Sequence, residues 1–290
     1  MPSAATVAWV VASAGDPRGG SRYARLLIVL AHVPAGDLPV PSAVSALADG
    51  HLVRPVWRNG RGGLTFEVTA PEERRFVKWA PVGSGIDLDA EATRLGWAAG
   101  RTPVPRLLAT GADASGTWLV TAALSGVNAV TPPWSDDPPT AAIAIGQGLR
   151  ALHDRLPVAD CPFSWTVEYR LARAGGRWLD RSRWHPEHAC LSLAEALARL
   201  AAPPSVDRLV VCHGDACAPN TLIGGDGNWS GHVDLGALGV ADRWADLAVA
   251  TWSLDWNYGP GWQSVLLDAY GVDPDPVRIG YYRLLWDLSP

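Results

Sequence analysis

Residues 211–236 read VCHGDACAPNTLIGGDGNWSGHVDLG and contain two short apolar runs, each followed by an aspartate. The first run, Leu209–Cys212, leads to Asp215, and the second, around His232–Val233, leads to Asp234. Short apolar runs bounded by glycine and polar residues are typical of buried strands. Asn220 follows soon after Asp215, so the segment predicts three oxygen-bearing side chains placed by two strands.

This arrangement favours phosphoryl transfer. That chemistry needs a carboxylate that orients the attacking hydroxyl and accepts its proton, and oxygen ligands for the Mg²⁺ ions that bridge the phosphates. The ordered pattern H-G-D-x-x-x-x-N followed by D-x-G supplies both. Asp215 is therefore the predicted catalytic carboxylate, and Asn220 and Asp234 are the predicted magnesium ligands. Two Asx turns in a surface loop are the competing interpretation, which the ordered set disfavours.

Composition narrows the class of protein. The chain has 290 residues, a hydrophobic fraction of 48% and 15 tryptophans, which indicates a globular protein with a sizeable core. The net charge of −5 argues against a nucleic-acid partner, which usually selects a basic surface. A mildly acidic protein is compatible with a cationic small substrate.

The cysteines and the N-terminal segment indicate the cellular compartment of the protein. The four cysteines show no disulfide-framework spacing, which favours a reducing cytoplasm. The apolar run Ala4–Ala14 has no preceding positive charge, as a secretory signal requires, and is too short to span a membrane. A β-hairpin of Val7–Ser13 and Arg25–His32 is predicted there instead. We therefore expect a cytoplasmic protein with no membrane partner.

A nucleotide site is expected in the first half of the chain. The predicted strands Leu52–Trp57 and Leu64–Thr69 flank a glycine turn whose backbone amides are candidates for phosphate contacts, at Gly60, Gly62 and Gly63. A third strand, Arg74–Trp79, carries Lys78, and the helix predicted over residues 87–100 carries Glu91. Lysine is rarely buried unless it is paired. A strand lysine paired with a helix glutamate would hold the α- and β-phosphates.

The remaining pattern changes from strands to helices. Further strands are predicted at Arg106–Thr110 and Thr117–Ala123, and the backbone amides of Thr121, Ala122, Ala123 and Leu124 are candidates for reading a purine edge. Apolar residues at helical spacing predominate after residue 140. The chain is therefore predicted to have a bilobal α+β, protein-kinase-like fold. Residues 1–123 would form an N-terminal lobe of antiparallel sheet plus helix, and residues 124–290 a mainly helical C-terminal lobe with the catalytic, metal and substrate sites.

Several segments resemble the aminoglycoside phosphotransferase family, in particular its 3′- and 3″-phosphotransferase branch. The resemblance covers about Val56 to Asp287. It is carried by HGDACAPN, VDLGALGVADRWADLAVA, RIGYYRLLWDL, ALHDRLPVADCPF and VPRLLATGADASGTWLVTAALSGV. The catalytic motifs are shared with choline and other small-molecule kinases, whereas G-V-A-D-R-x-x-D-x-A and the Tyr-Arg-Leu-Leu ending are more specific to the antibiotic branch.

The resemblance implies phosphorylation of a hydroxyl of an aminoglycoside antibiotic, with ATP or GTP as donor and Mg²⁺ as cofactor, which inactivates the antibiotic. It also implies that carboxylates of the C-terminal lobe hold the amino groups of the substrate. The candidates here are Glu187, Asp255 and Asp287.

The chain departs from the family pattern at three places. Ala237 stands where relatives usually have an arginine, Trp286 replaces one acid of the chain's ending, and Gly62 replaces the hydroxyl-bearing residue of the glycine turn. The parts needed for phosphoryl transfer remain, but the antibiotic and the hydroxyl that is modified stay open. An acceptor with fewer amino groups, such as streptomycin, is compatible with these changes.

Three other functions share parts of this pattern. A biosynthetic or metabolic kinase for another amino-sugar natural product or amino-alcohol differs only in its pocket acids. A pseudokinase binding module is disfavoured because Lys78, Asp215, Asn220 and Asp234 are all present. A protein kinase is disfavoured because no arginine follows His213 and no A-P-E segment follows the D-x-G.

Overall fold

The computed structural model describes residues 31–32, 38–71, 73–174, 181 and 184–288. By their contacts these residues fall into two compact units. The first contains the described residues up to Ile86 together with Ala109–Val120, and the second contains Asp87–Leu108 and the described residues from Thr121 onward. The predicted N-terminal hairpin lies outside the described residues apart from Ala31–His32, which form the short strand β1.

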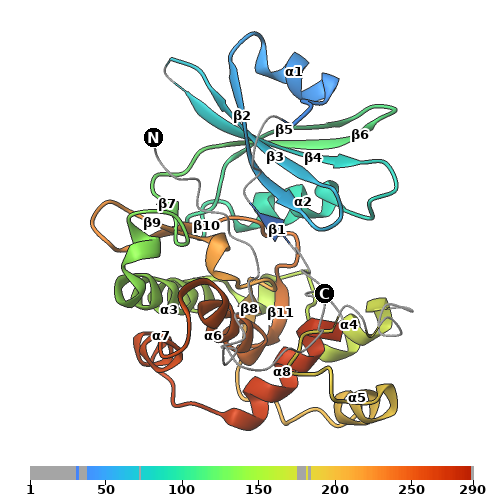
Figure 1. Cartoon of the computed structure of the whole chain (residues 1–290), viewed down its shortest axis with the longest axis vertical. Coiled ribbons are helices and arrows are strands. Elements are labelled where there is room, and N and C mark those ends of the chain that lie inside the picture. Colours follow the sequence, from blue (N-terminus) through green and yellow to red (C-terminus); the bar gives the residue numbers. More distant parts are fainter. Residues whose placement is uncertain (1–30, 33–37, 72, 175–180, 182–183, 289–290) are drawn as a thin grey trace, which may run out of the picture. The chain divides into compact units, whose positions relative to one another are not determined.

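The first unit is built on an antiparallel sheet (Figure 1). Among the described residues the strand order is β1-β2-β3-β4-β6-β5. The strands are β2 (Leu52–Asn59), β3 (Leu64–Thr69), β4 (Arg74–Pro81), β5 (Leu107–Ala112) and β6 (Gly116–Ala122), and the helix α1 spans Ser42–Ala48. In this register Phe66 of β3 faces Val77 of β4, and both are fully buried. Lys78 is paired with Thr65, one step along the same ladder.

The helix α2 (Leu88–Ala98) belongs to the second unit, although the sequence places it among the strands of the first. Its start is fixed by Asp87, whose side chain accepts a hydrogen bond from the Ala90 amide at 2.9 Å. Glu91 and Leu95, on one face of the helix, are 5% and 1% exposed. The predicted lobes divided at residues 123 and 124, whereas the compact units change at residues 120 and 121 and assign α2 to the second.

The second unit is mainly helical. Its longer helices are α3 (Pro138–Arg155), α4 (Val167–Ala174), α5 (Leu193–Leu200), α6 (Trp244–Tyr258), α7 (Gln263–Tyr270) and α8 (Pro276–Leu288). Helix α6 is buried from Trp244 to Leu254, and it packs on α7 and α8, while α3 packs along α7 (Figure 1). A helix that is apolar on all sides is a core helix. The core of this unit therefore surrounds α6.

Two small sheets lie beside these helices. The strands β10 (Trp229–His232), β9 (Thr221–Ile223) and β7 (Val127–Asn128) form one, and β11 (Gly239–Asp242) and β8 (Leu209–Cys212) form the other. β8 and β11 are antiparallel, with Cys212 opposite Gly239. The segment between these strands contains Asp215, Asn220 and Asp234, so the two small sheets bring the predicted catalytic motif together.

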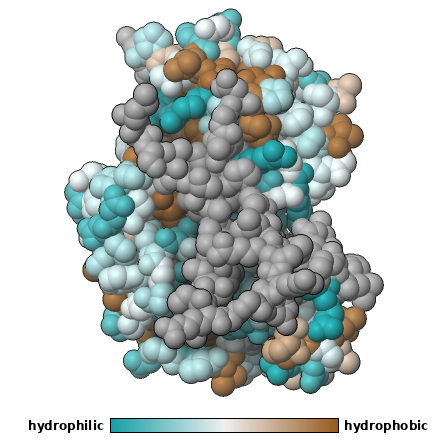
Figure 2. Space-filling view, viewed as in Figure 1, coloured by the Kyte–Doolittle hydropathy of each residue, from teal (hydrophilic) through white to brown (hydrophobic). Residues whose placement is uncertain are grey.

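The surface carries its large exposed hydrophobic residues on separate elements. Leu52, Val82 and Val277 are each about 70% exposed. On the face shown in Figure 2, hydrophobic residues of the described surface are interspersed with hydrophilic ones. Scattered exposed hydrophobic residues are normal for a globular protein. None of the helices in the described ranges combines the length and apolarity that a membrane span requires.

Candidate active site

The catalytic loop begins where β8 ends. Gly214 has φ +87°, and a Cβ atom there would come within 2.2 Å of the Ala237 carbonyl oxygen. Only glycine fits this close approach between the two catalytic segments. The chain then turns into Asp215, whose amide donates to Nδ1 of His213 at 3.3 Å.

A buried aspartate on α6 holds the start of this loop. Asp246 is fully buried, and its carboxylate accepts hydrogen bonds from the His213 amide at 2.6 Å and the Gly214 amide at 2.9 Å. His153 at the end of α3 donates from Nε2 to the same carboxylate at 3.0 Å. Burial favours the neutral acid, but the hydrogen bond and the charge interaction with His153 outweigh it and lower the pKa of Asp246. Asp246 therefore anchors the start of the catalytic loop.

Cys212 lies near His153 and Asp246, and these three side chains are grouped closely enough to suggest a metal site. The hydrogen bonds of His153 and Asp246 to one another and to the loop amides already use their ligand atoms. Burial raises the pKa of the Cys212 thiol well above its usual range, which disfavours the thiolate that metal binding requires. The cluster is therefore structural.

Backbone hydrogen bonds join the two halves of the catalytic motif. The Val233 amide donates to the Asn220 carbonyl at 3.0 Å, and His213 Nε2 donates to the Val233 carbonyl at 2.9 Å. Asn220 also donates from Nδ2 to the Asp215 carbonyl at 2.8 Å and to Oδ2 of Asp215 at 3.3 Å. Asn220, Asp215 and the residue before Asp234 thus belong to one hydrogen-bonded frame.

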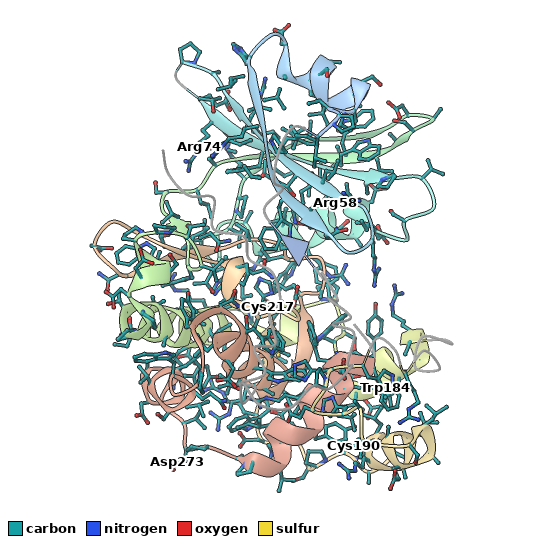
Figure 3. All side chains as sticks on the ribbon, viewed as in Figure 1. Arg58, Arg74, Trp184, Cys190, Cys217 and Asp273 are labelled. Carbon is teal, nitrogen blue, oxygen red and sulfur yellow. The ribbon has the colours of Figure 1, made fainter. Side chains whose placement is uncertain are left out.

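The two aspartates influence each other electrostatically. Burial raises the pKa of Asp215, and the negative charge of Asp234 raises it further. Hydrogen bonds from Cys217, at 3.1 Å to Oδ1, and from Trp286 act in the opposite direction. Cys217, labelled in Figure 3, lies on the catalytic loop itself. Asp234 has φ +64°, a left-handed conformation that aspartate tolerates better than most residues.

Helix α2 reaches the same segment. A Cβ atom on Gly236 would lie 3.8 Å from Cβ and 4.0 Å from Oε2 of Glu91. Arg94, one turn further along α2, donates from Nε to the Leu238 carbonyl at 2.9 Å. The structure therefore places Glu91 against the Asp-Leu-Gly turn. Lys78 belongs to the other unit, so its pairing with Glu91 stays a prediction.

The glycine turn is closed by its own hydrogen bonds. Asn59 Oδ1 accepts from the amides of Arg61 at 3.0 Å and Gly63 at 2.8 Å, and the Gly62 amide donates to the Asn59 carbonyl at 3.1 Å. Gly62 has φ +85°, and a Cβ atom on Gly63 would meet Asn59 Nδ2 at 2.6 Å. These glycines are required by the turn, and a phosphate would have to compete with Asn59 for two of the amides. Contacts with phosphate at Gly60, Gly62 and Gly63 stay a prediction.

The predicted purine-reading segment follows β6. The Ala122 amide donates to the Arg106 carbonyl at 2.9 Å and is therefore occupied within the chain. Thr121 is 9% exposed, and Ala123 and Leu124 are partly buried. Recognition of a base by Thr121, Ala122, Ala123 and Leu124 stays a prediction.

The three predicted substrate acids differ in their surroundings. Asp287 is only 7% exposed at its side chain, and it accepts hydrogen bonds from the His185 amide at 2.9 Å and from His188 Nδ1 at 2.7 Å. Asp255 accepts from Gln263 Nε2 at 2.6 Å, and burial raises its pKa. Glu187 is the most open, with 43% of its side chain exposed, and it lies 3.9 Å from Nη1 of Arg283.

Sequence reasoning missed the aromatic residues around these acids. Trp252 and Trp256 on α6, Trp286 on α8 and His185 lie in mutual ring contact. Their positions are far apart in the sequence, but the replacement of an expected acid by Trp286 was a visible signal.

Comparison with known proteins identifies the family. Residues 53–281 match the family described as the phosphotransferase enzyme family. An aminoglycoside 3′-phosphotransferase from Streptomyces fradiae is 35% identical and covers 77% of this chain and 90% of its own. The streptomycin 3″-kinase of Streptomyces griseus is also 35% identical, over 79% of this chain and 94% of its own.

Solved structures give the same answer. An aminoglycoside 3′-phosphotransferase of type VIII superposes with a TM-score of 0.73, 29% identity and coverage of 85% of this chain and 97% of that one. An aminoglycoside phosphotransferase from Streptomyces rimosus, in complex with ADP and streptomycin, has a TM-score of 0.68 and 27% identity, covering 86% and 99%. The predicted bilobal α+β kinase-like fold and the predicted phosphotransferase activity are confirmed. The chain therefore belongs to the phosphotransferase enzyme family, among relatives that are aminoglycoside phosphotransferases.

Proposed function

We propose that this enzyme transfers the γ-phosphoryl group of ATP or GTP to a hydroxyl of an aminoglycoside antibiotic in the cytoplasm and thereby inactivates the antibiotic. The observation that carries the proposal is the hydrogen-bonded frame that joins Asp215, Asn220 and the residue before Asp234. The names of the curated relatives and the complex of a structural relative with ADP and streptomycin support the donor and the acceptor class.

The residues of this frame fit a magnesium site. Mg²⁺ prefers oxygen ligands, and it is usually bound by one or two carboxylates together with substrate phosphates. Asn220 uses Nδ2 in its bonds to Asp215, so its amide oxygen is the atom that it would offer to a metal. The mutual repulsion of Asp215 and Asp234 would be relieved by a divalent cation. Asn220 and Asp234 would hold the ion, which would neutralise the phosphate charge.

Asp215 would act on the acceptor hydroxyl. An ionised carboxylate orients this hydroxyl towards the γ-phosphorus atom and accepts its proton as the new P–O bond forms. Asn220 and Cys217 contact the two oxygens of Asp215 and restrict its rotation. Positioning of this kind is a major source of rate enhancement in phosphoryl transfer.

Lys78 and Glu91 would serve the donor. In this proposal the ammonium group of Lys78 contacts the α- and β-phosphates and Glu91 orients it. Lys78 is the only lysine in the sequence, and the other basic side chains in the Lys+Arg count are arginines. An amine-reactive nucleotide analogue therefore has one candidate side chain.

The test is acceptor-dependent release of nucleoside diphosphate. The purified protein would be assayed with Mg-ATP and Mg-GTP against kanamycin, neomycin, streptomycin and hygromycin B, with Asp215→Asn as the blank. Release that depends on one of these acceptors and is lost in the variant supports the proposal and identifies the acceptor. Nucleotide binding without release for any of them refutes it in favour of a kinase for another amino-sugar or amino-alcohol. Absence of nucleotide binding would favour a binding module.

A further inference from the structure

Four rings form an aromatic platform in the second unit, which we define as Trp252, Trp256, Trp286 and His185. The centroids of Trp256 and Trp286 are 5.7 Å apart with an interplanar angle of 38°, and Trp252 lies 4.8 Å from Trp256. His185 packs edge-on against Trp252 at 4.3 Å. Trp252 is only 2% exposed, whereas Trp256 and Trp286 are partly exposed. Trp252 therefore supports the other two indoles, which keep accessible ring surface.

The platform adjoins the catalytic loop. The Ala218 amide of this loop donates to Ser253 Oγ at 2.9 Å, and Ser253 follows Trp252 on α6. The ring centroids of Trp252 and Trp286 are 6.1 Å apart. The next residue, Asp287, holds the segment of His185 through the His185 amide and His188 Nδ1. Trp184, labelled in Figure 3 near α8, is on the same segment. Asp287, near the end of α8, thus holds the His185 segment next to Trp286.

Negative charge lies beside the platform. Glu187 lies close enough to His185 and Asp255 to influence the pKa of each electrostatically. Arg283 is largely buried and donates to Thr251 Oγ1 at 3.2 Å and Gln263 Oε1 at 3.1 Å, so it is engaged within the chain. Its charge interacts with both acids, and Nη1 lies 3.9 Å from the Glu187 carboxylate. Glu187, with 43% of its side chain exposed, is the more accessible acid at the rim of the platform, and the two acids with Arg283 leave a net negative charge there.

We propose that Trp286 positions the acceptor for this reaction: its ring, with that of Trp256, carries the apolar face of a cationic sugar or aminocyclitol ring beside the catalytic loop. This inference rests on the proposed function and deepens it. Aromatic faces attract amino and guanidino groups as well as the C–H faces of sugar rings. The selected acceptors are therefore those that expose a flat apolar face with a cationic group at its edge, where Glu187 lies.

The role of the ring can be tested by substitution. Trp286→Phe keeps a ring on the platform, whereas Trp286→Leu removes it. Trp97→Phe is the matched control, because the Trp97 indole donates a hydrogen bond to the Asp160 carbonyl at 3.3 Å and packs edge-on against Phe163, outside the platform. The variants would be compared by steady-state kinetics with the best acceptor and by calorimetric titration with that acceptor in the presence of a non-hydrolysable ATP analogue.

We expect Trp286→Phe to keep KM for the acceptor within about twofold of the wild type, because a ring stays on the platform. We expect Trp286→Leu to raise KM and the calorimetric Kd for the acceptor about tenfold, while KM for ATP stays unchanged. If Trp286 had a purely structural role, its substitution would change the kinetic parameters for the acceptor and for ATP together. Kinetics of both variants equal to those of Trp97→Phe would overturn the inference while leaving the phosphotransferase intact. A wild-type enzyme that modifies no aminoglycoside would refute the proposed function itself.

Discussion

Replacement of Asp246 by asparagine tests whether α6 holds the catalytic loop. The Asp246 carboxylate is buried and accepts from three donors, the amides of His213 and Gly214 and Nε2 of His153. An asparagine offers one oxygen and presents an NH₂ group to the remaining donors, so at least one buried donor loses its partner. Each such loss costs about 1–3 kcal/mol, and we expect a total of about 2–4 kcal/mol. This is a large fraction of the stability of an ordinary domain.

The assay combines stability with kinetics. The expected loss corresponds to a fall of roughly 5–10 °C in Tm. Because the loop also carries Asp215, we expect kcat to fall about 100-fold. Asp242→Asn is the control: Asp242 is also buried and accepts from the amides of Asp207 at 2.7 Å and Trp244 at 3.0 Å, but it does not contact the catalytic loop through these bonds. It should lower Tm and leave kcat within about twofold of the wild type.

The effect of Asp246→Asn on stability should depend on pH. The pKa of Asp246 is lowered in the folded protein from the ordinary value of 3.8. Its contribution to stability is therefore fully present above that value and is lost as the pH falls through the lowered pKa. The stability difference between wild type and Asp246→Asn should narrow in acid. A Tm within about 1 °C of the wild type at neutral pH, together with unchanged kcat, would refute the role assigned to Asp246.

Three further substitutions test the other parts of the site. Asp215→Asn should abolish turnover while nucleotide still binds, since Lys78 and Asp234 remain; measurable turnover would remove Asp215 from the catalytic role. Gly214→Ala should destabilise the protein by about 2–3 kcal/mol and inactivate it, because a Cβ atom would clash with the Ala237 carbonyl and φ is +87°; a stable, active variant would contradict the described loop. An acyl-phosphate ATP probe should label Lys78, with protection by ADP, and Lys78→Ala should lose the label and lower the rate; labelling that ADP does not prevent would place Lys78 away from the phosphates.

Local patterns accounted for much of the fold. The predicted segments Leu64–Thr69 and Leu209–Cys212 coincide with β3 and β8. In each of them the signal is contained in a few adjacent residues. The catalytic frame was predictable for the same reason, because Asp215, Asn220 and Asp234 lie in one short segment whose spacing is itself the signal.

Elements that depend on distant partners were harder to predict. The strands β9 (Thr221–Ile223) and β11 (Gly239–Asp242) were not anticipated, because each is short and is stabilised by a strand elsewhere in the chain. Asp242 ends β11, and its carboxylate accepts from the Trp244 amide at 3.0 Å, at the first residue of α6.

The residues predicted to bind the acceptor show the same limit of prediction from local sequence. Resemblance singled out Asp287 as a substrate ligand, but its carboxylate is engaged with the His185 amide and His188. The aromatic platform draws on residues separated by as many as 101 positions, from His185 to Trp286, and no local pattern links them. The resemblance therefore named individual acids, whereas the aromatic platform beside them depends on tertiary packing.

In the proposed reaction a phosphoryl group moves from a nucleotide to an aminoglycoside hydroxyl on this enzyme. The most direct measurement is to incubate the protein with ATP carrying a radiolabelled γ-phosphoryl group and the acceptor that gives the fastest release, and to isolate the acceptor. We predict label on the acceptor, a mass increased by one phosphoryl group, and neither with Asp215→Asn. Label that appears only as inorganic phosphate, or that reaches the acceptor equally with the variant, would contradict the account.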